Sequence, residues 1–240
     1  MQKYRFINGF HLKLIAICTM FIDHMGATLF PDDLLLRCVG RVAFPIFCFL
    51  VAEGCVYTRS RWKYALRLLV FAVLSEIPFN LMVSVTQVWY RYAQNVLWTL
   101  LAGALLCWLM DWSLKKRRLP TFLPTAAAMV AAFWLLEVCH TDYGGWGMLL
   151  VPMFYAIHRA PYGSAAKMAA QAVGLAFFCL AVMGGAVTIE LYAMLALLPI
   201  WLYNGRRGFS NRVVQYGFYA FYPVHILVLS LIRLCQFHLL

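Results

Sequence analysis

The stretch of sequence that decides the fold is His11-Leu-Lys-Leu-Ile-Ala-Ile-Cys-Thr-Met-Phe-Ile-Asp-His24. Its apolar residues predict the first half of a membrane-spanning helix, yet it also contains Lys13, Asp23 and His24. An ionisable side chain inside a bilayer costs roughly 2.5–3.5 kcal/mol on insertion scales, so such residues indicate a functional site. The stretch therefore predicts both a membrane fold and one wall of a site.

The spacing of two of these side chains adds detail. Lys13 and His24 are eleven positions apart, which is about three helical turns at roughly 3.6 residues per turn, so they share one face. At about 1.5 Å per residue they lie roughly 16 Å apart along the helix. A cation at one depth and a histidine deeper on the same face suit a long ligand with an anionic head.

The composition extends this prediction to the whole chain. Of 240 residues, 64% are hydrophobic and 12% are charged, and the mean hydropathy is +0.77. A typical soluble domain is about 25% charged, so the sequence predicts an all-α integral membrane protein. The net charge is +11, and the basic residues fall mostly in short loops. We therefore expect them to set topology and to meet anionic headgroups of the lipid bilayer, with no nucleic-acid partner.

The cysteines do not indicate a metal or redox site. The chain has eight of them, scattered through apolar segments, and no Cys-x-x-Cys pair occurs. Zinc and redox motifs require such close pairs. We expect these cysteines to act as small apolar side chains, with no metal bound.

Apolar segments and loop charges predict a bundle of about nine transmembrane helices in a single domain, residues 1–240. The loops after the second, fourth, sixth and eighth segments are rich in Lys and Arg, whereas the other loops contain only Arg91. By the positive-inside rule the amino terminus is then cytoplasmic. Gly184-Gly185 is predicted to turn the chain between the seventh and eighth segments. The predicted segments are 12–30, 34–57, 64–85, 93–112, 122–138, 146–157, two within 168–203, and 213–232.

This topology places two sets of polar residues at different depths. Six groups are predicted to meet in the outer half of the membrane, and three lie near the inner face with the basic loops. A structural alternative for the outer set is an Arg41–Glu76 ion pair with polar packing around it. The outer set is Asp23, His24, Arg41, Glu76, Asn95 and His225; the inner set is Lys13, Glu53 and Arg67.

Other ionisable residues lie near predicted segment ends. Solvation at the membrane interface or in a loop is the simpler interpretation for each of them. They are Glu137, Asp142, Glu190, His11, His140, His158 and His238.

The outer set suits acid–base chemistry. A histidine titrates near neutral pH, and a carboxylate such as Glu76 can orient it. The inner cations suit phosphate, which side chains would hold because the sequence has no glycine-rich phosphate loop. An acyl-coenzyme A matches both ends, with its phosphates at the inner face and its thioester near His24.

Ordered motifs along nearly the whole chain resemble the TraX family of conjugal-transfer proteins. TraX proteins are similar to the wider transmembrane acyltransferase group that includes the acyltransferase-3 proteins. In that group a basic residue precedes a histidine with ten residues between them, as Lys13 and His24 do, although Arg is the commoner basic residue. The matching motifs are 12–26, Gly40-Arg-Val-Ala-Phe-Pro-Ile-Phe47, Phe49-Leu-Val-Ala-Glu-Gly54, Arg67-Leu68, Ser75-Glu-Ile-Pro-Phe79, Gln94-Asn95, Asp142-Tyr-Gly144 and Phe221-Tyr-Pro-Val-His225.

The resemblance implies acetyl transfer from acetyl-CoA, the donor substrate, across the bacterial inner membrane. In TraX the acceptor is the amino terminus of pilin, but no motif here indicates a conjugative pilus, so a protein amine and an envelope glycan both stay open. His24 would act as general base or accept the acetyl group itself. Arg41 and Asn95 would stabilise the oxyanion, and Lys13 would bind CoA phosphate. The nine predicted segments are fewer than the ten or so usual in the larger group.

Two other functions fit the same residues. A proton-coupled small-molecule transporter also uses intramembrane His, Asp, Glu and Arg groups, but the repeated halves that many transporters have are missing from the sequence. A structural assembly factor would tolerate apolar replacement of the polar residues. Binding of CoA favours the enzyme, whereas flux driven by a pH gradient without CoA favours the transporter.

Overall fold

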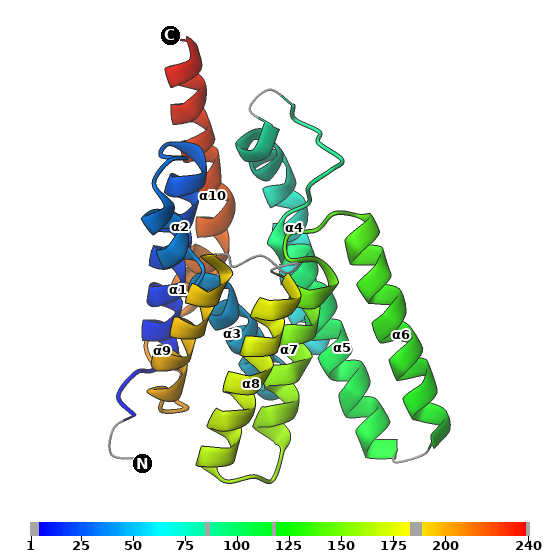
Figure 1. The fold of residues 1–240 in the computed structure, drawn as a ribbon. Helices are drawn as coiled ribbons and strands as arrows, with labels where there is room; N and C mark the ends of the chain where they lie inside the picture. Colours follow the sequence, from blue (N-terminus) through cyan, green and yellow to red (C-terminus); the bar gives the residue numbers. More distant parts are fainter. Residues whose placement is uncertain (1–4, 85–86, 117–118, 183–188, 239–240) are drawn as a thin grey trace.

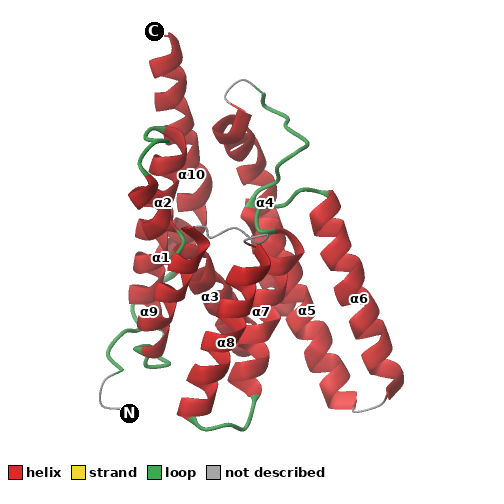
Figure 2. Ribbon diagram, viewed as in Figure 1, coloured by secondary structure: helices red, strands yellow, loops and turns green. Residues whose placement is uncertain are grey.

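The computed structural model describes residues 5–84, 87–116, 119–182 and 189–238. Within these ranges the chain forms helices joined by short loops, and β-structure is confined to two isolated bridges (Figure 2). Backbone inside a bilayer must satisfy its own hydrogen bonds, which a helix does within one segment. The predicted all-α fold is confirmed. The predicted turn at Gly184-Gly185 lies outside the described residues.

Seven helical segments in the described ranges are long and apolar enough to cross a membrane. They are α1 (Gly9–Thr28), α2 (Leu34–Gly40) continued by α3 (Ala43–Tyr57), α4 (Arg61–Ser84), α5 (Val96–Lys116), α6 (Leu119–Val138), α8 (Ser164–Val182) and α10 (Arg212–His238). Two shorter segments are α7 (Gly144–Arg159) and the 3₁₀ helix η2 (Ile189–Ala196) continued by α9 (Leu197–Trp201). Together these segments match the predicted bundle of about nine.

The helices run alternately up and down the bundle (Figure 1). The amino terminus lies at the bottom of the view and the carboxyl terminus at the top, as an odd number of crossings requires. The loop 160–163, one of the predicted basic inner loops, lies at the same end as the amino terminus. This arrangement agrees with the loop-charge prediction of topology.

Side-chain caps and one break fix the first two crossings. Asn8 Oδ1 accepts from the backbone N–H groups of Phe10 and His11, both at 3.0 Å, so α1 begins at Gly9. The predicted second span is interrupted by a turn at Arg41 and Val42, between α2 and α3. The Arg41 side chain therefore projects from the break between α2 and α3, at the level where the polar residues lie.

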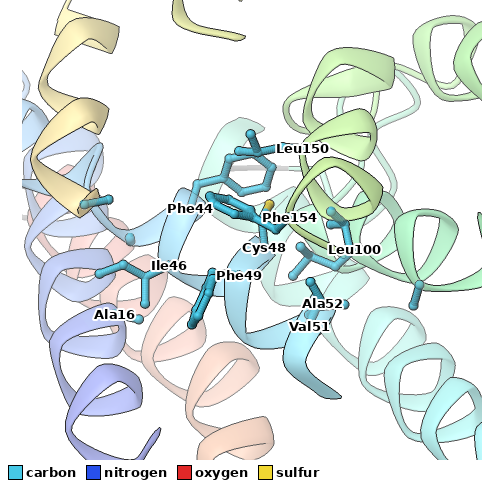
Figure 3. Close-up of a cluster of buried hydrophobic side chains, with 14 of the residues drawn as sticks. Ala16, Phe44, Ile46, Cys48, Phe49, Val51, Ala52, Leu100, Leu150 and Phe154 are labelled. Carbon is cyan, nitrogen blue, oxygen red and sulfur yellow. The ribbon is translucent and has the colours of Figure 1, made fainter. Parts of the chain in front are cut away.

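The apolar core is built around α3, which packs against α1, α5, α7 and η2. Figure 3 shows its side chains between those of three neighbouring helices. A helix that buries residues on all sides belongs at the centre of a bundle. The core residues labelled there are Phe44, Ile46, Cys48, Phe49, Val51 and Ala52 of α3, with Ala16 of α1, Leu100 of α5, and Leu150 and Phe154 of α7.

Some segments stop part of the way up the bundle. In Figure 1, α7, α8 and η2 reach only about the middle of the view, whereas α4 and α10 extend well above them. Tyr143 directly precedes the upper end of α7, and Glu190 lies in the first turn of η2. Irregular backbone at membrane depth is tolerated where protein buries it, and here it brings polar side chains into the interior.

Candidate functional site

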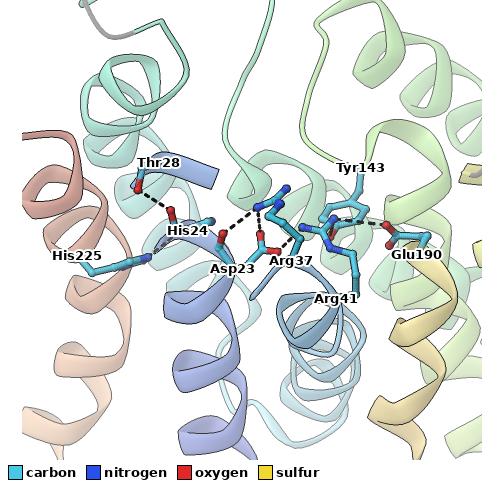
Figure 4. Close-up of polar contacts among 8 residues, drawn as sticks. All are labelled: Asp23, His24, Thr28, Arg37, Arg41, Tyr143, Glu190 and His225. Atoms are coloured by element: carbon cyan, nitrogen blue, oxygen red, sulfur yellow. Dashed lines mark hydrogen bonds and ion pairs between the residues drawn. The ribbon is translucent and has the colours of Figure 1, made fainter. Parts of the chain in front are cut away.

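Two histidines from helices at opposite ends of the sequence are in direct contact. His24 Nδ1 on α1 and His225 Nε2 on α10 are 2.7 Å apart, and the ring planes differ by only 3°. Both side chains are buried. Figure 4 shows the pair at one end of a row of polar residues that crosses the bundle. The structure thus brings together the two histidines that depth alone placed at one level.

The hydrogen bonds of this pair have a direction. His225 Nδ1 lies 2.6 Å from the carbonyl oxygen of Phe221, which can only accept, so Nδ1 carries a proton. In a neutral His225, Nε2 is then the acceptor, and His24 Nδ1 must donate to it. His24 Nε2 is left without a proton. Neither ring contacts a carboxylate within the described ranges, so nothing there favours a charged pair.

Asp23, the neighbour of His24, belongs to a separate network. Its carboxylate accepts from Arg41 Nη2 and from Arg37 Nη1, each at 2.6 Å. Arg41 Nη1 also donates to the Tyr143 hydroxyl at 2.8 Å and lies 3.4 Å from Glu190 Oε2. Buried charges require such partners. The network joins α1, α2, η2 and the residue before α7 (Figure 4).

Tyr143 adopts an unusual backbone conformation at this network. Its φ is +61°, in the left-handed region that costs roughly 1–2 kcal/mol for a residue with a Cβ. Its ring stacks on Phe44 with centroids 3.8 Å apart, and its hydroxyl accepts from Arg41. Strained residues of this kind cluster at functional sites. Sequence reasoning assigned Tyr143 no role, although Asp142-Tyr-Gly144 was among the motifs of the resemblance.

Glu76 and Asn95 form a third group, between α4 and the start of α5. Asn95 Nδ2 donates to Glu76 Oε2 and to the Ala72 carbonyl, and Trp98 Nε1 donates to the same carboxylate oxygen at 2.8 Å. Asn95 Oδ1 accepts from the Leu97 N–H at 3.1 Å, which caps α5. The amide of Asn95 therefore links α4 to α5 through Nδ2 and caps α5 through Oδ1.

These contacts correct three expectations. The six outer groups do not form one cluster but three, and the alternative Arg41–Glu76 pair is wrong because each residue has other partners. Arg41 uses both terminal nitrogens on Asp23, Tyr143 and Glu190, which leaves Nε as its donor without a hydrogen bond in the described ranges. Glu190 is buried and paired with Arg41 rather than solvated in a loop.

The inner cations lie on either side of one stretch of α10. Lys13 Nζ on α1 is 5.4 Å from the centre of the Phe218 ring, and neighbouring Tyr219 stacks on Phe71 of α4. Arg67, one turn earlier on α4, lies over Tyr64. In the part of the chain that the structure describes, neither cation pairs with an Asp or Glu. Both remain suited to an anionic ligand.

Glu53 has partners of its own. His158 Nδ1 lies 2.7 Å from Glu53 Oε1, and the Tyr203 hydroxyl donates to Oε2 at 3.3 Å. Burial and the nearby Glu53 carboxylate raise the pKa of the Tyr203 phenol, so it stays protonated as a donor. His158 is thus held by Glu53. The sequence alone predicts a solvated interface residue at His158, without this partner. These contacts place Glu53 in a separate inner group from Lys13 and Arg67.

A metal centre has no support among the described residues. No group of three or more His, Cys, Asp or Glu side chains there has the arrangement needed to hold an ion.

The chain is similar in sequence to known proteins. A family model described as "TraX protein" matches residues 8–233. The chain is 32% identical over 246 residues to the "Probable fimbrial assembly protein FimC, serogroup H1" of Dichelobacter nodosus, covering 92% of this chain and 94% of that protein. It is 25% identical over 118 residues to the "Uncharacterized protein RP591" of Rickettsia prowazekii (strain Madrid E), covering 43% of this chain and 47% of that protein. No solved structure matches the chain.

Proposed function

This chain belongs to the TraX family, and we propose that it is a membrane-embedded acyltransferase that moves an acetyl group from acetyl-CoA to an acceptor amine or hydroxyl of the cell envelope. The observation that supports this most is the buried His24–His225 contact of 2.7 Å. It lies about three turns of α1 above Lys13, a cation without an acidic partner in the described ranges. One helix thus presents a base and a phosphate-binding group at two depths.

His24 Nε2 is the base in this proposal. It removes a proton from the attacking amine or hydroxyl as that group adds to the thioester carbonyl. This addition forms the new carbon–nitrogen or carbon–oxygen bond, and collapse of the tetrahedral intermediate then re-forms the carbonyl and breaks the carbon–sulfur bond. The proton on His24 then passes to the departing CoA thiolate, which leaves as the thiol. His225 positions His24 by accepting from its Nδ1.

The roles at the inner face follow from charge. Lys13 and Arg67 are the cations that would bind the phosphates of CoA, since neither has an acidic partner in the described part of the chain. Glu53 is not assigned to the donor, because His158 and Tyr203 occupy its carboxylate. The Asp23–Arg41 network holds α1 and α2 in place beside the histidines. Arg41 Nε is its candidate donor to the developing oxyanion.

The acceptor is proposed from the relatives. The Dichelobacter nodosus relative carries the name of a fimbrial assembly protein, and TraX proteins are linked to conjugation. We propose that the acceptor is a pilin-like amino terminus or an envelope glycan on the side opposite the basic loops. The protein would then lie in the bacterial inner membrane, where acetyl-CoA reaches it from the cytoplasm.

The test is transfer of labelled acetyl by the purified full-length protein in lipid nanodiscs. Labelled acetyl-CoA and a cell-envelope extract are added, and the labelled product is identified by mass spectrometry. We expect label on one protein or glycan class with the wild type, and a loss of about 100-fold or more with His24→Ala. The control is His11→Ala, an exposed histidine on the same helix.

Two results would refute the proposal. One is transfer by His24→Ala at the wild-type rate, and the other is no labelled product above a protein-free blank. In the second case, flux driven by a pH gradient in liposomes without CoA would establish the transporter instead.

A further inference from the structure

A second polar group lies at the inner end of the bundle, away from the histidines. Asp111 on α5 is almost fully buried, with 3% of its side chain exposed. Three cations from three helices converge on it: Arg61 Nη2 of α4 at 2.5 Å, Lys115 Nζ of α5 at 2.9 Å and Arg159 Nη2 of α7 at 3.3 Å. One carboxylate cannot neutralise three cations, so two positive charges remain.

Gathering like charges costs free energy unless an anion joins them. The three cations are only partly exposed at 46%, 65% and 48% of their side chains, so each still presents N–H groups to the surface. None of them pairs with a second Asp or Glu in the described ranges. Arg159 is further fixed by Tyr155, whose ring lies 6.0 Å from the guanidinium carbon. The cations are thus arranged before any ligand arrives.

Two tryptophans indicate the depth of this group in the membrane. Trp62 follows Arg61 and Trp112 follows Asp111, and their exposed fractions are 74% and 43%. Exposed tryptophans at helix ends mark the level of lipid headgroups. The lower ends of α5 and α7 lie on the side of the amino terminus (Figure 1). This depth matches that of the lipid phosphates in the leaflet on that side.

We propose that Arg61, Lys115 and Arg159, held by Asp111, form a binding site for the phosphodiester of an anionic phospholipid. Guanidinium groups recognise phosphate with paired N–H donors, and Lys115 adds a point charge. Asp111 acts by positioning the cations, because its carboxylate repels the phosphate. The site is distinct from the proposed acyl-transfer groups and does not depend on that function.

The direction in which Asp111→Asn changes lipid binding distinguishes an organised site from non-specific electrostatic attraction. Asp111→Asn makes the face more positive, so non-specific attraction predicts tighter binding of anionic lipid. An organised site predicts weaker binding, because the cations lose the group that gathers them. We would measure phosphatidylglycerol bound to the full-length protein by native mass spectrometry, with phosphatidylcholine as the neutral comparison. Tighter binding by Asp111→Asn would overturn the proposal.

Matched charge removals make the test independent of how well Asp111→Asn folds. Arg159→Gln is expected to weaken phosphatidylglycerol binding about fivefold, the factor for ~1 kcal/mol per surface cation. Lys63→Gln removes an exposed charge at the same end of α4 that has no ion pair in the described ranges, and should change binding less than twofold. Equal effects of the two variants would refute the site. Displacement of the lipid by excess CoA would also refute it, because the phosphates would then be those of the acyl donor.

Discussion

Asp23 and His24 are adjacent in sequence, yet they belong to two unlike regions. The Asp23 region is saturated except at Arg41 Nε: its carboxylate accepts from two arginines, and Arg41 reaches Tyr143 and Glu190 as well. The His24 region is sparse: within the described ranges the His24 ring has one hydrogen-bond partner, His225, and its Nε2 has none. A saturated network of charges holds helices in place, whereas a buried base with an unused lone pair is suited to chemistry. The following predictions test that division.

The largest effect is expected from Arg41→Ala. This change leaves the buried Asp23 and Glu190 carboxylates without their shared cation, which typically costs about 3–5 kcal/mol. Equilibrium unfolding of the purified protein in bicelles measures the loss. The exposed Arg91→Ala is the control, with a cost of about 1 kcal/mol or less. An Arg41→Ala protein as stable as the wild type would show that the network does not hold the fold.

His225→Leu is expected to affect rate rather than stability. Without an acceptor for its Nδ1–H, His24 loses its fixed tautomer, and the acetyl-transfer kcat should fall by about 100-fold with KM for acetyl-CoA little changed. His225→Gln keeps a carbonyl acceptor and should retain most of the rate. Equal losses in the Leu and Gln variants would mean that His225 does not act through this hydrogen bond.

Gly40→Ala should disturb the saturated region through packing alone. A Cβ at Gly40 would lie 2.1 Å from Asp23 Cβ and Oδ1, so α2 must move away from α1. Overpacking of this kind costs about 2 kcal/mol, measurable in the same unfolding assay. Gly163→Ala is the control because nothing lies within 4 Å of its added Cβ. Identical stability of the two variants would contradict the close approach of α1 and α2.

The smallest effect is expected from Lys13→Gln. Loss of one phosphate contact at a partly exposed site should weaken CoA binding about fivefold, or ~1 kcal/mol. The difference in CoA affinity between Lys13→Gln and the wild type should shrink at high salt, because salt screens the attraction between Lys13 and the phosphate. Calorimetric titration at low and high salt measures both, with the exposed Lys116→Gln as control. An unchanged affinity at low salt would remove Lys13 from the donor site.

The sequence by itself determined the membrane fold, the approximate helix count and the common level of His24 and His225 along the bundle. These follow from local quantities: apolar length, loop charge and a rise of about 1.5 Å per residue. The same arithmetic places His24 and His225 at one level without any information on their contact. It also separated the outer polar groups from the inner cations.

Only the tertiary structure decided which polar groups touch. Depth along a helix does not fix rotation about its axis, and adjacent residues point about 100° apart. That rotation sends His24 to α10 and Asp23 to Arg41, and it directs Glu76 to Asn95 rather than to Arg41. Partners such as Tyr143 and His158 depend on where short helices end in the packed bundle. No periodicity in the sequence records those positions.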